Sequence, residues 1–303
     1  MCAAKRAKRR KRKSAASPAG LTKLVEILSG PARPLLVIAL LGVAAFGAWY
    51  FVWNRVQHQV LSSEEYLVTP ENVEITSPPD WVHTDIRAEV FRSACLDRPL
   101  SIMDDDLTER IKDAFSLHPW VAKVRQVTKH HPARVKVDRD YRRPVCMVDI
   151  VTGLLPVDAN GVLLPFDDFS PVEASRYPRL VGIDTVPVGP PGESWGDARV
   201  IGGAEIADAL SDVWKPWRLW QIIASPSGIE SESSYTLLTR GGTRIRWGLA
   251  PGSKVPGELP VSDKLARLQQ YVRQYGTLEG RGGPQELDVY KLQPVRISSR
   301  PEH

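Results

Sequence analysis

The sequence predicts an α+β protein with a single transmembrane helix, then a small β-α-α-β-β module, then a second mixed, mostly antiparallel α/β module. One uncharged run of 19 residues, 35–53, lies near the N-terminus and is followed by short apolar segments of strand or helix period separated by turn residues. The 303 residues are 43% hydrophobic and 25% charged, which is the composition of globular proteins and a length for roughly two domains. Wholesale disorder and a polytopic membrane protein are therefore excluded.

The basic charge of the chain belongs to its N-terminal tail. Residues 1–34 hold ten Lys and Arg and one acid, so their net charge is +9. The whole chain has a net charge of +5, so the remaining residues carry −4. The run 35–53 would reach roughly 28 Å as a helix and ends in an aromatic belt of Trp49, Tyr50, Phe51 and Trp53. Positive charge before the span predicts a cytoplasmic N-terminus, with residues 54–303 on the other side of the membrane.

Two other interpretations of the N-terminus compete with this one. A cleaved signal peptide has a shorter apolar core and small residues at the cleavage site, whereas bulky aromatics stand there in this chain. The basic run could bind nucleic acid, but a solvated tail beside anionic lipid explains the same charges. An uncleaved signal anchor is favoured.

The first outer module is expected at 71–142, after a polar linker at 54–70. A strand at 73–75 alternates in polarity, and Thr84 or Asp85 can cap a helix that ends near Ser93.

A second helix of this module is expected to follow Asp104 as its N-cap. Its apolar stripe contains Leu107, Ile111, Ala114 and Phe115. The acids Asp104, Asp105 and Asp106 could hold a cation, but capping and dipole effects favour a helix start. Strands near 121–127 and 134–139 would then form a hairpin around Lys129 to Pro132.

The second outer module is expected at 143–297, before a tail at 298–303. Its predicted elements are a hairpin over 154–164 with Asn160-Gly161 at the turn, a strand at 179–182, a loop at 187–192, a helix at 204–217, a strand from 220, a hairpin over 234–248, a helix at 261–275 and a strand at 286–290. The spaced residues Trp214, Trp217 and Trp220 favour core packing over a glycan platform.

Catalytic and metal-binding motifs are largely absent from the sequence. Asp167 and Asp168 could form a paired-carboxylate site, but solvated turn residues are favoured beside Ser170-Pro171. Cys95 and Cys146 could form a disulfide outside the cytoplasm, although two separate buried thiols are favoured. No cofactor or metal is expected, and the balance favours binding or scaffolding over catalysis.

An ordered set of motifs resembles the FtsQ/DivIB family of bacterial cell-division proteins. Residues 115–124 (FSLHPWVAKV) resemble the family's junction between second helix and strand, and 131–137 (HPARVKV) resemble its hairpin. Residues 142–145 (RRPV) with 155–162 (LPVDANGV) resemble the entry into its second domain. Lys264-Leu265 with Leu268, and later 286–289 (ELDV), resemble its C-terminal pattern.

The resemblance implies a POTRA domain at 71–142, an FtsQ-like β domain at 143–297, and a non-enzymatic subunit of the division machinery in the bacterial inner membrane. Its implied partners are FtsB/FtsL-type coiled-coil proteins and other membrane proteins of the division machinery, bound by adding a strand to the C-terminal sheet edge. Exposed edges offer unpaired backbone groups for such pairing. The candidate contact residues are Leu287, Asp288, Val289, Tyr290, Val295 and Ile297.

Two alternatives remain open. One is a POTRA-bearing subunit for outer-membrane or secretion assembly, although barrel strands and repeats are missing from the sequence. The other is a signal-anchored cell-wall hydrolase, which would need a convergent acid/base or metal constellation that the sequence does not offer.

Overall fold

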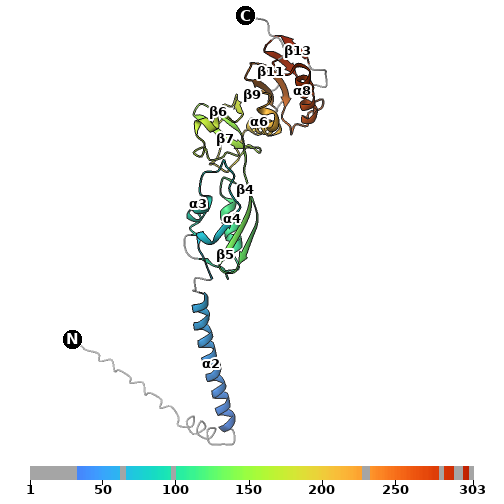
Figure 1. Cartoon of the computed structure of the whole chain (residues 1–303). Coiled ribbons are helices and arrows are strands. Elements are labelled where there is room, and N and C mark those ends of the chain that lie inside the picture. The colour runs from blue at the N-terminus through green and yellow to red at the C-terminus, as the bar shows by residue number, and fades with distance from the viewer. Residues whose placement is uncertain are drawn as a thin grey trace, which may run out of the picture. The chain divides into compact units, whose positions relative to one another are not determined.

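A computed structural model of the chain describes residues 33–61, 66–96, 100–226, 233–279, 283–289 and 296–299. It separates into two compact units, residues 1–63 and 64–303. Within the first unit, helix α2 (Arg33–Leu61) is drawn in blue in Figure 1. Among the described residues it is the one helix long and apolar enough to cross a membrane, over Val37–Arg55, and the side chains of that stretch are exposed. A single candidate membrane span is therefore supported.

Helix α2 is longer than the predicted span of 35–53. The linker expected at 54–70 is wrong for residues 54–61, which continue the helix. Residues 54–69 contain neither Gly nor Pro, so no strong helix breaker follows the apolar run. The predicted linker also overlaps strand β1 (Leu67–Val68) and the first residue of the 3₁₀ helix η2 (Pro70–Asn72).

The first module of the second unit contains the predicted β-α-α-β-β elements with one additional short strand, β3, between the two helices. The elements are β2 (Val73–Ile75), α3 (Ile86–Ser93), β3 (Leu100–Ser101), α4 (Leu107–Ser116), β4 (Val121–His130) and β5 (Arg134–Tyr141). The sheet order is β2-β5-β4, with β2 parallel and β4 antiparallel to β5. The short strands β1 and β3 form a separate antiparallel pair.

The two helices of this module bury one apolar face each in its core. In α3, Asp85 is the N-cap and its carboxylate accepts a hydrogen bond of 3.2 Å from the backbone N–H of Ala88. All four stripe residues of α4 are buried. The predicted N-cap Asp104 is wrong: the cap position belongs to Asp106, and the Asp104 carboxylate lies 3.7 Å from Arg110 instead.

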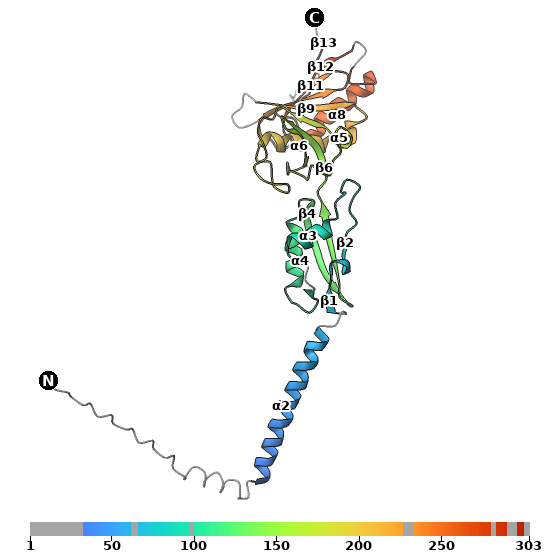
Figure 2. The same cartoon turned by 90° about the vertical axis from the view of Figure 1, so that its left-hand side faces the viewer.

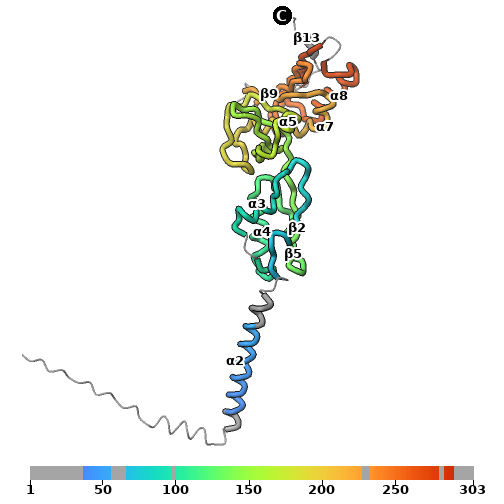
Figure 3. Tube along the Cα trace, turned by 60° about the vertical axis from the view of Figure 1, so that its left-hand side comes forward, coloured from blue at the N-terminus to red at the C-terminus, as the bar shows by residue number. Residues whose placement is uncertain are grey.

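The second module contains an eight-stranded sheet, seen in green to red in Figure 2. Its strands are β6 (Pro144–Ile150), β7 (Gly153–Asp158), β8 (Arg179–Val181), β9 (Leu219–Pro226), β10 (Ser233–Thr239), β11 (Arg244–Leu249), β12 (Gln285–Asp288) and β13 (Arg296–Ser299), in the order β13-β12-β11-β10-β9-β8-β6-β7. Within the described residues, four neighbouring pairs are antiparallel and three are parallel, so the sheet is mixed. The tube in Figure 3 follows the chain from β2 in cyan to α8 in orange.

One predicted hairpin of this sheet differs from the structure. β7 pairs mainly with the preceding strand β6, and residues after Gly161 contribute only isolated bridges such as Val157 to Leu163. Asp158 explains the turn, because its Oδ1 accepts hydrogen bonds from the backbone N–H groups of Asn160 and Val162 at 2.9 and 3.0 Å. The Asn-Gly turn is thus present, but its second arm pairs with the loop at Ser194.

The long helices cover one face of the sheet. The second-module helices are α5 (Pro171–Ala174), α6 (Ala198–Ala209), α7 (Ser211–Trp214) and α8 (Val261–Tyr275). The hydroxyl of Tyr235 reaches α6 with a hydrogen bond to the carbonyl of Arg199, and Lys264 of α8 lies 4.8 Å from the ring centroid of Trp247. Tyr235 and Trp247 belong to the same buried face, since both join the core of this sheet.

The helix predicted at 204–217 is wrong in its bounds. It begins six residues earlier and ends at Ala209, and a separate turn, α7, follows. A Cβ at Gly202 would lie 2.4 Å from the Tyr235 hydroxyl, and one at Gly203 would lie 2.5 Å from a Leu180 methyl. Glycine is a poor helix former, but here it permits close approach of helix and sheet.

The boundary predicted at 142/143 coincides with the change of sheet, yet packing crosses it. Leu164 is fully buried in the core of the first module, and Phe169 packs against that core. The segment 164–169 of the second module therefore completes the first.

Candidate partner-binding site

The C-terminal edge of the large sheet is where the sequence places the partner site. Strand β12 is parallel to β11 on one side and antiparallel to β13 on the other, with Leu287 opposite Ile297. The outermost strand is therefore β13, formed by residues 296–299. An added strand would meet the free backbone edge of β13 rather than that of β12.

The six predicted contact residues fall into three groups. Leu287 and Val289 are fully buried in the core of the sheet. Asp288 is half-buried, and its Oδ1 is enclosed without a hydrogen-bond partner among the described residues. Ile297 lies in β13, but its side chain, like Tyr290 and Val295, lies outside the described residues. The structure thus brings Leu287 and Val289 together as core residues.

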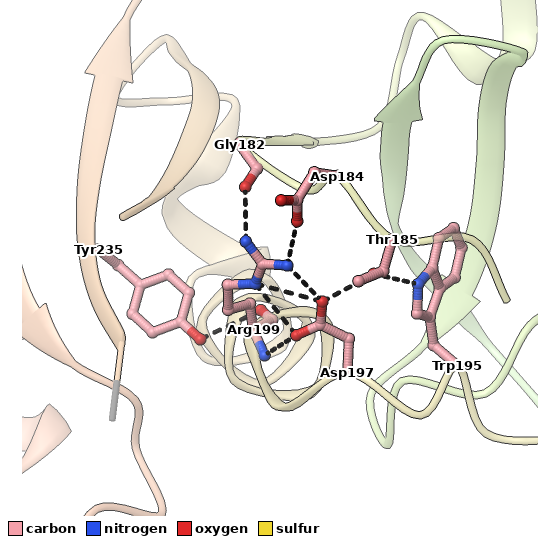
Figure 4. Close-up of polar contacts among 7 residues, drawn as sticks. All are labelled: Gly182, Asp184, Thr185, Trp195, Asp197, Arg199 and Tyr235. Carbon is pink, nitrogen blue, oxygen red and sulfur yellow. Dashed lines mark hydrogen bonds and ion pairs between the residues drawn. The ribbon is translucent and has the colours of Figure 1, made fainter. Parts of the chain in front are cut away.

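A second cluster, which the expectations from the sequence did not include, gathers around Arg199 (Figure 4). Asp197 is the N-cap of α6, and its Oδ1 accepts a hydrogen bond of 2.8 Å from the backbone N–H of Arg199. The Arg199 guanidinium donates to both oxygens of Asp197 and to the Asp184 carboxylate. Thr185 donates to Asp197 at 2.7 Å and accepts from the Trp195 indole at 3.2 Å. These contacts close the loop 184–197 onto the start of α6.

The electrostatics of this cluster keep all three groups charged. Hydrogen bonds from Arg199 lower the pKa of Asp184. Burial raises the pKa of Asp197, but the hydrogen bonds from Arg199 and Thr185 outweigh it, and the net pKa is lowered. The two carboxylates in turn raise the pKa of Arg199. A site built this way can hold a loop in place, whereas a proton relay near neutral pH would need pKa values moved toward 7.

The prediction that Asp167 and Asp168 are both solvated turn residues is wrong for Asp168. Its carboxylate accepts a hydrogen bond of 2.7 Å from Thr84 and one of 2.6 Å from the indole of Trp120. Only Asp167 is exposed. Asp168 therefore ties the first module to the second.

The tryptophan and cysteine expectations are partly confirmed. Trp214 and Trp217 are buried in the core, while Trp220 is 36% exposed. Both Cys95 and Cys146 are free, and burial raises the pKa of the Cys146 thiol. The expectation that Cys95 is buried is wrong, because it lies exposed after α3 with a φ of 53°.

Among the described residues, no group of three or more His, Cys, Asp or Glu is placed to hold a metal ion.

A signal for the Arg199 cluster existed in the sequence, since Asp197 before an apolar-periodic run is an N-cap pattern. The glycines at 202 and 203 masked that run. Asp168 had no local signal, because its partners are 84 and 48 residues away.

No known protein family matches this sequence, and no curated protein matches it.

Proposed function

We propose that the chain is a single-pass membrane scaffold of the FtsQ/DivIB type, which recruits small coiled-coil membrane partners of the FtsB/FtsL type during bacterial division. The first module would be a POTRA domain and the second the partner-binding β domain. The tail at 1–34 would lie in the cytoplasm and residues beyond the span outside the inner membrane.

Three structural features support this proposal. The first module has the order β2-α3-α4-β4-β5, with β2 parallel to β5 in a three-stranded sheet. Helix α2 is long and apolar enough for a single anchor. The large sheet ends in β13, which pairs on one side only among the described residues. The third feature carries the proposal, because a strand edge recruits partners through backbone hydrogen bonds.

A proline scan of β13 tests this proposal. Successive residues of a strand direct their N–H groups to opposite edges. Proline substitutions at positions 296, 297, 298 and 299, made one at a time, therefore alternate in effect: one removes a hydrogen bond to β12, and the next removes an N–H that points to the free edge. The full-length chain would be co-expressed with an FtsB/FtsL-type protein, and co-purification and unfolding would be measured for each variant. We expect two alternate positions to lose partner binding while the unfolding midpoint is unchanged.

Two outcomes would contradict the proposal. Partner capture that survives all four substitutions would exclude strand addition at β13. If every substitution that loses partner binding also lowers the unfolding midpoint, the loss would reflect disruption of the fold and not of a binding edge.

A further inference from the structure

A pocket of about 510 Å³ opens where the first module meets the second. Trp81 and His83 of the first module line it, together with Tyr177, Trp214 and basic residues of the second. Its volume lies within the range of ligand sites, and its walls combine aromatic rings with a few polar groups. None of the residues of β12 or β13 lines it, so the pocket is distinct from the C-terminal edge.

The aromatic wall is held in place before any ligand arrives. The Trp81 indole donates a hydrogen bond of 3.1 Å to the carbonyl of Arg142. Phe169 packs edge-on against Tyr177, with ring centroids 5.8 Å apart, and its other neighbour is Trp120 at 6.1 Å. Rigid aromatic side chains give large contact area at a small entropy cost.

The basic side of the pocket carries charge that nearby carboxylates compensate only in part: hydrogen bonds from Ser170 and, to a smaller extent, the charges of His83 and Arg176 lower the pKa of Glu173. Arg143 is paired with Asp208. Arg176 and Lys215 are exposed, and neither side chain forms an ion pair within the described part of the chain. Both remain available to a carboxylate, with Arg offering a fork geometry that suits one.

The same pocket also offers hydrogen-bond acceptors. Asp80 is exposed at its rim, and Glu173 faces His83 at 3.6 Å while also accepting hydrogen bonds from Ser170. A bare phosphate headgroup presents acceptors alone and would be repelled by these carboxylates. A peptide presents an N–H donor at each residue besides its acidic side chains, so it complements both kinds of group.

We propose that this pocket binds an acidic peptide segment of a partner protein. A carboxylate of the segment pairs with Arg176 and Lys215, and a neighbouring apolar side chain packs between Trp81 and Trp214. Because both modules line the pocket, an occupant contacts both at once.

Phage display of random 12-residue peptides on the full-length chain in phosphatidylcholine nanodiscs tests this inference. The selections would use the wild type, the R176E/K215E variant, and the control K112E/R273E, which reverses an exposed Lys and an exposed Arg outside the pocket. We expect wild-type peptides with Asp or Glu beside an aromatic or aliphatic residue, bound about tenfold more weakly by R176E/K215E and equally by the control. Selection on R176E/K215E should yield Lys or Arg at the acidic position.

The alternative outcomes each overturn the inference. Peptides without acidic enrichment, or peptides that bind R176E/K215E as well as the wild type, exclude this pocket as an acidic-peptide site. Phosphatidylglycerol vesicles that bind the wild type and lose binding to R176E/K215E, with no peptide doing so, assign the pocket to lipid headgroups. Near-ultraviolet circular dichroism of each variant verifies its fold, and each single reversal should give part of the loss.

Discussion

The indole Nε1 of Trp120 donates a hydrogen bond of 2.6 Å to Oδ2 of Asp168, across the boundary between the two modules. Trp120 is fully buried in the core of the first module, while Asp168 comes from the loop after β7. The other oxygen of the same carboxylate accepts a hydrogen bond from Thr84. One acidic side chain therefore satisfies two donors of the other module.

Replacing Asp168 by Ala should lower the free energy of unfolding by about 1–3 kcal/mol, because a buried indole N–H and a hydroxyl lose their acceptor. Urea titration of the full-length chain in detergent would measure the change. The neighbouring, exposed Asp167→Ala is the matched control and should change stability by less than about 0.5 kcal/mol. Equal effects of the two substitutions would contradict the structural role of Asp168.

His118 should make the stability of the chain fall in mild acid. Burial lowers the pKa of its imidazole below the ordinary 6.5, and the charge of Arg139 acts in the same direction. The hydrogen bond and charge of Glu89 and the charge of Asp168 raise the pKa, but the net pKa remains lowered. The unfolded chain then binds a proton at a higher pH than the folded chain, so stability falls as the pH drops from about 6.5 to the folded pKa.

The slope in that window should reach at most about 1.4 kcal/mol per pH unit, and His118→Gln should remove it. Urea midpoints measured between pH 7.5 and 5.5 would show this difference. Exposed His130→Gln is the control and should keep the wild-type slope. A His118→Gln variant with an undiminished slope would refute the assignment.

Arg199→Leu should release the loop 184–197. Asp197, with 11% of its side chain exposed, would lose its cationic partner, at a cost of about 1.5–3 kcal/mol. Limited proteolysis of the full-length chain should then show faster cleavage within the loop. Asp184→Ala is the comparison: this carboxylate is 82% exposed, so its loss should destabilise the chain less than the loss of Arg199 does. Unchanged proteolysis in Arg199→Leu would mean that other contacts hold the loop.

Gly202→Ala should destabilise the second module by about 1–3 kcal/mol, because the added methyl would lie 2.4 Å from the Tyr235 hydroxyl and 2.7 Å from Ala250. Gly252→Ala is the control, since its nearest atoms are the Glu205 carboxylate oxygens at 3.5 Å. Thermal unfolding of both variants would measure the difference. Similar melting temperatures for the two would show that α6 can shift away from the sheet.

The membrane orientation can be tested with alkaline phosphatase fused after His303. The excess of basic residues before α2 predicts an active fusion, because the enzyme folds only outside the cytoplasm. A green fluorescent protein fused before Met1 should fluoresce in the same cells. An inactive phosphatase fusion that is fully expressed would contradict the predicted topology.

Segments with a strong period were predictable from the sequence. The helix at 261–275 forms with its predicted bounds, because Leu265, Leu268, Val272 and Tyr275 recur on one side. The strands around 134–139 and 234–239 likewise follow from alternation of polar and apolar residues. In each case a local pattern and the burial that it produces agree.

Other features depended on contacts that no local pattern reveals. The start of α6 was missed because Gly202 and Gly203 lower helix propensity, and their role is close packing against residues of other strands. The roles of Leu164 and Asp168 in the first module depend on residues far away in the chain. The expected strand at 286–290 did not reveal that a further strand follows it, since pairing of residues 296–299 with β12 could not be derived from their composition.

The insertion of Leu164 into the first core affects the order in which the chain matures during translation. The β-α-α-β-β segment ends at Tyr141, but its core still lacks a residue until Leu164 has been synthesised. The larger sheet waits longer, because buried Leu287 and Val289 are added only after α8. A nascent chain halted after Leu164 and before Leu287 would therefore carry one complete hydrophobic core and one that still exposes apolar surface to chaperones.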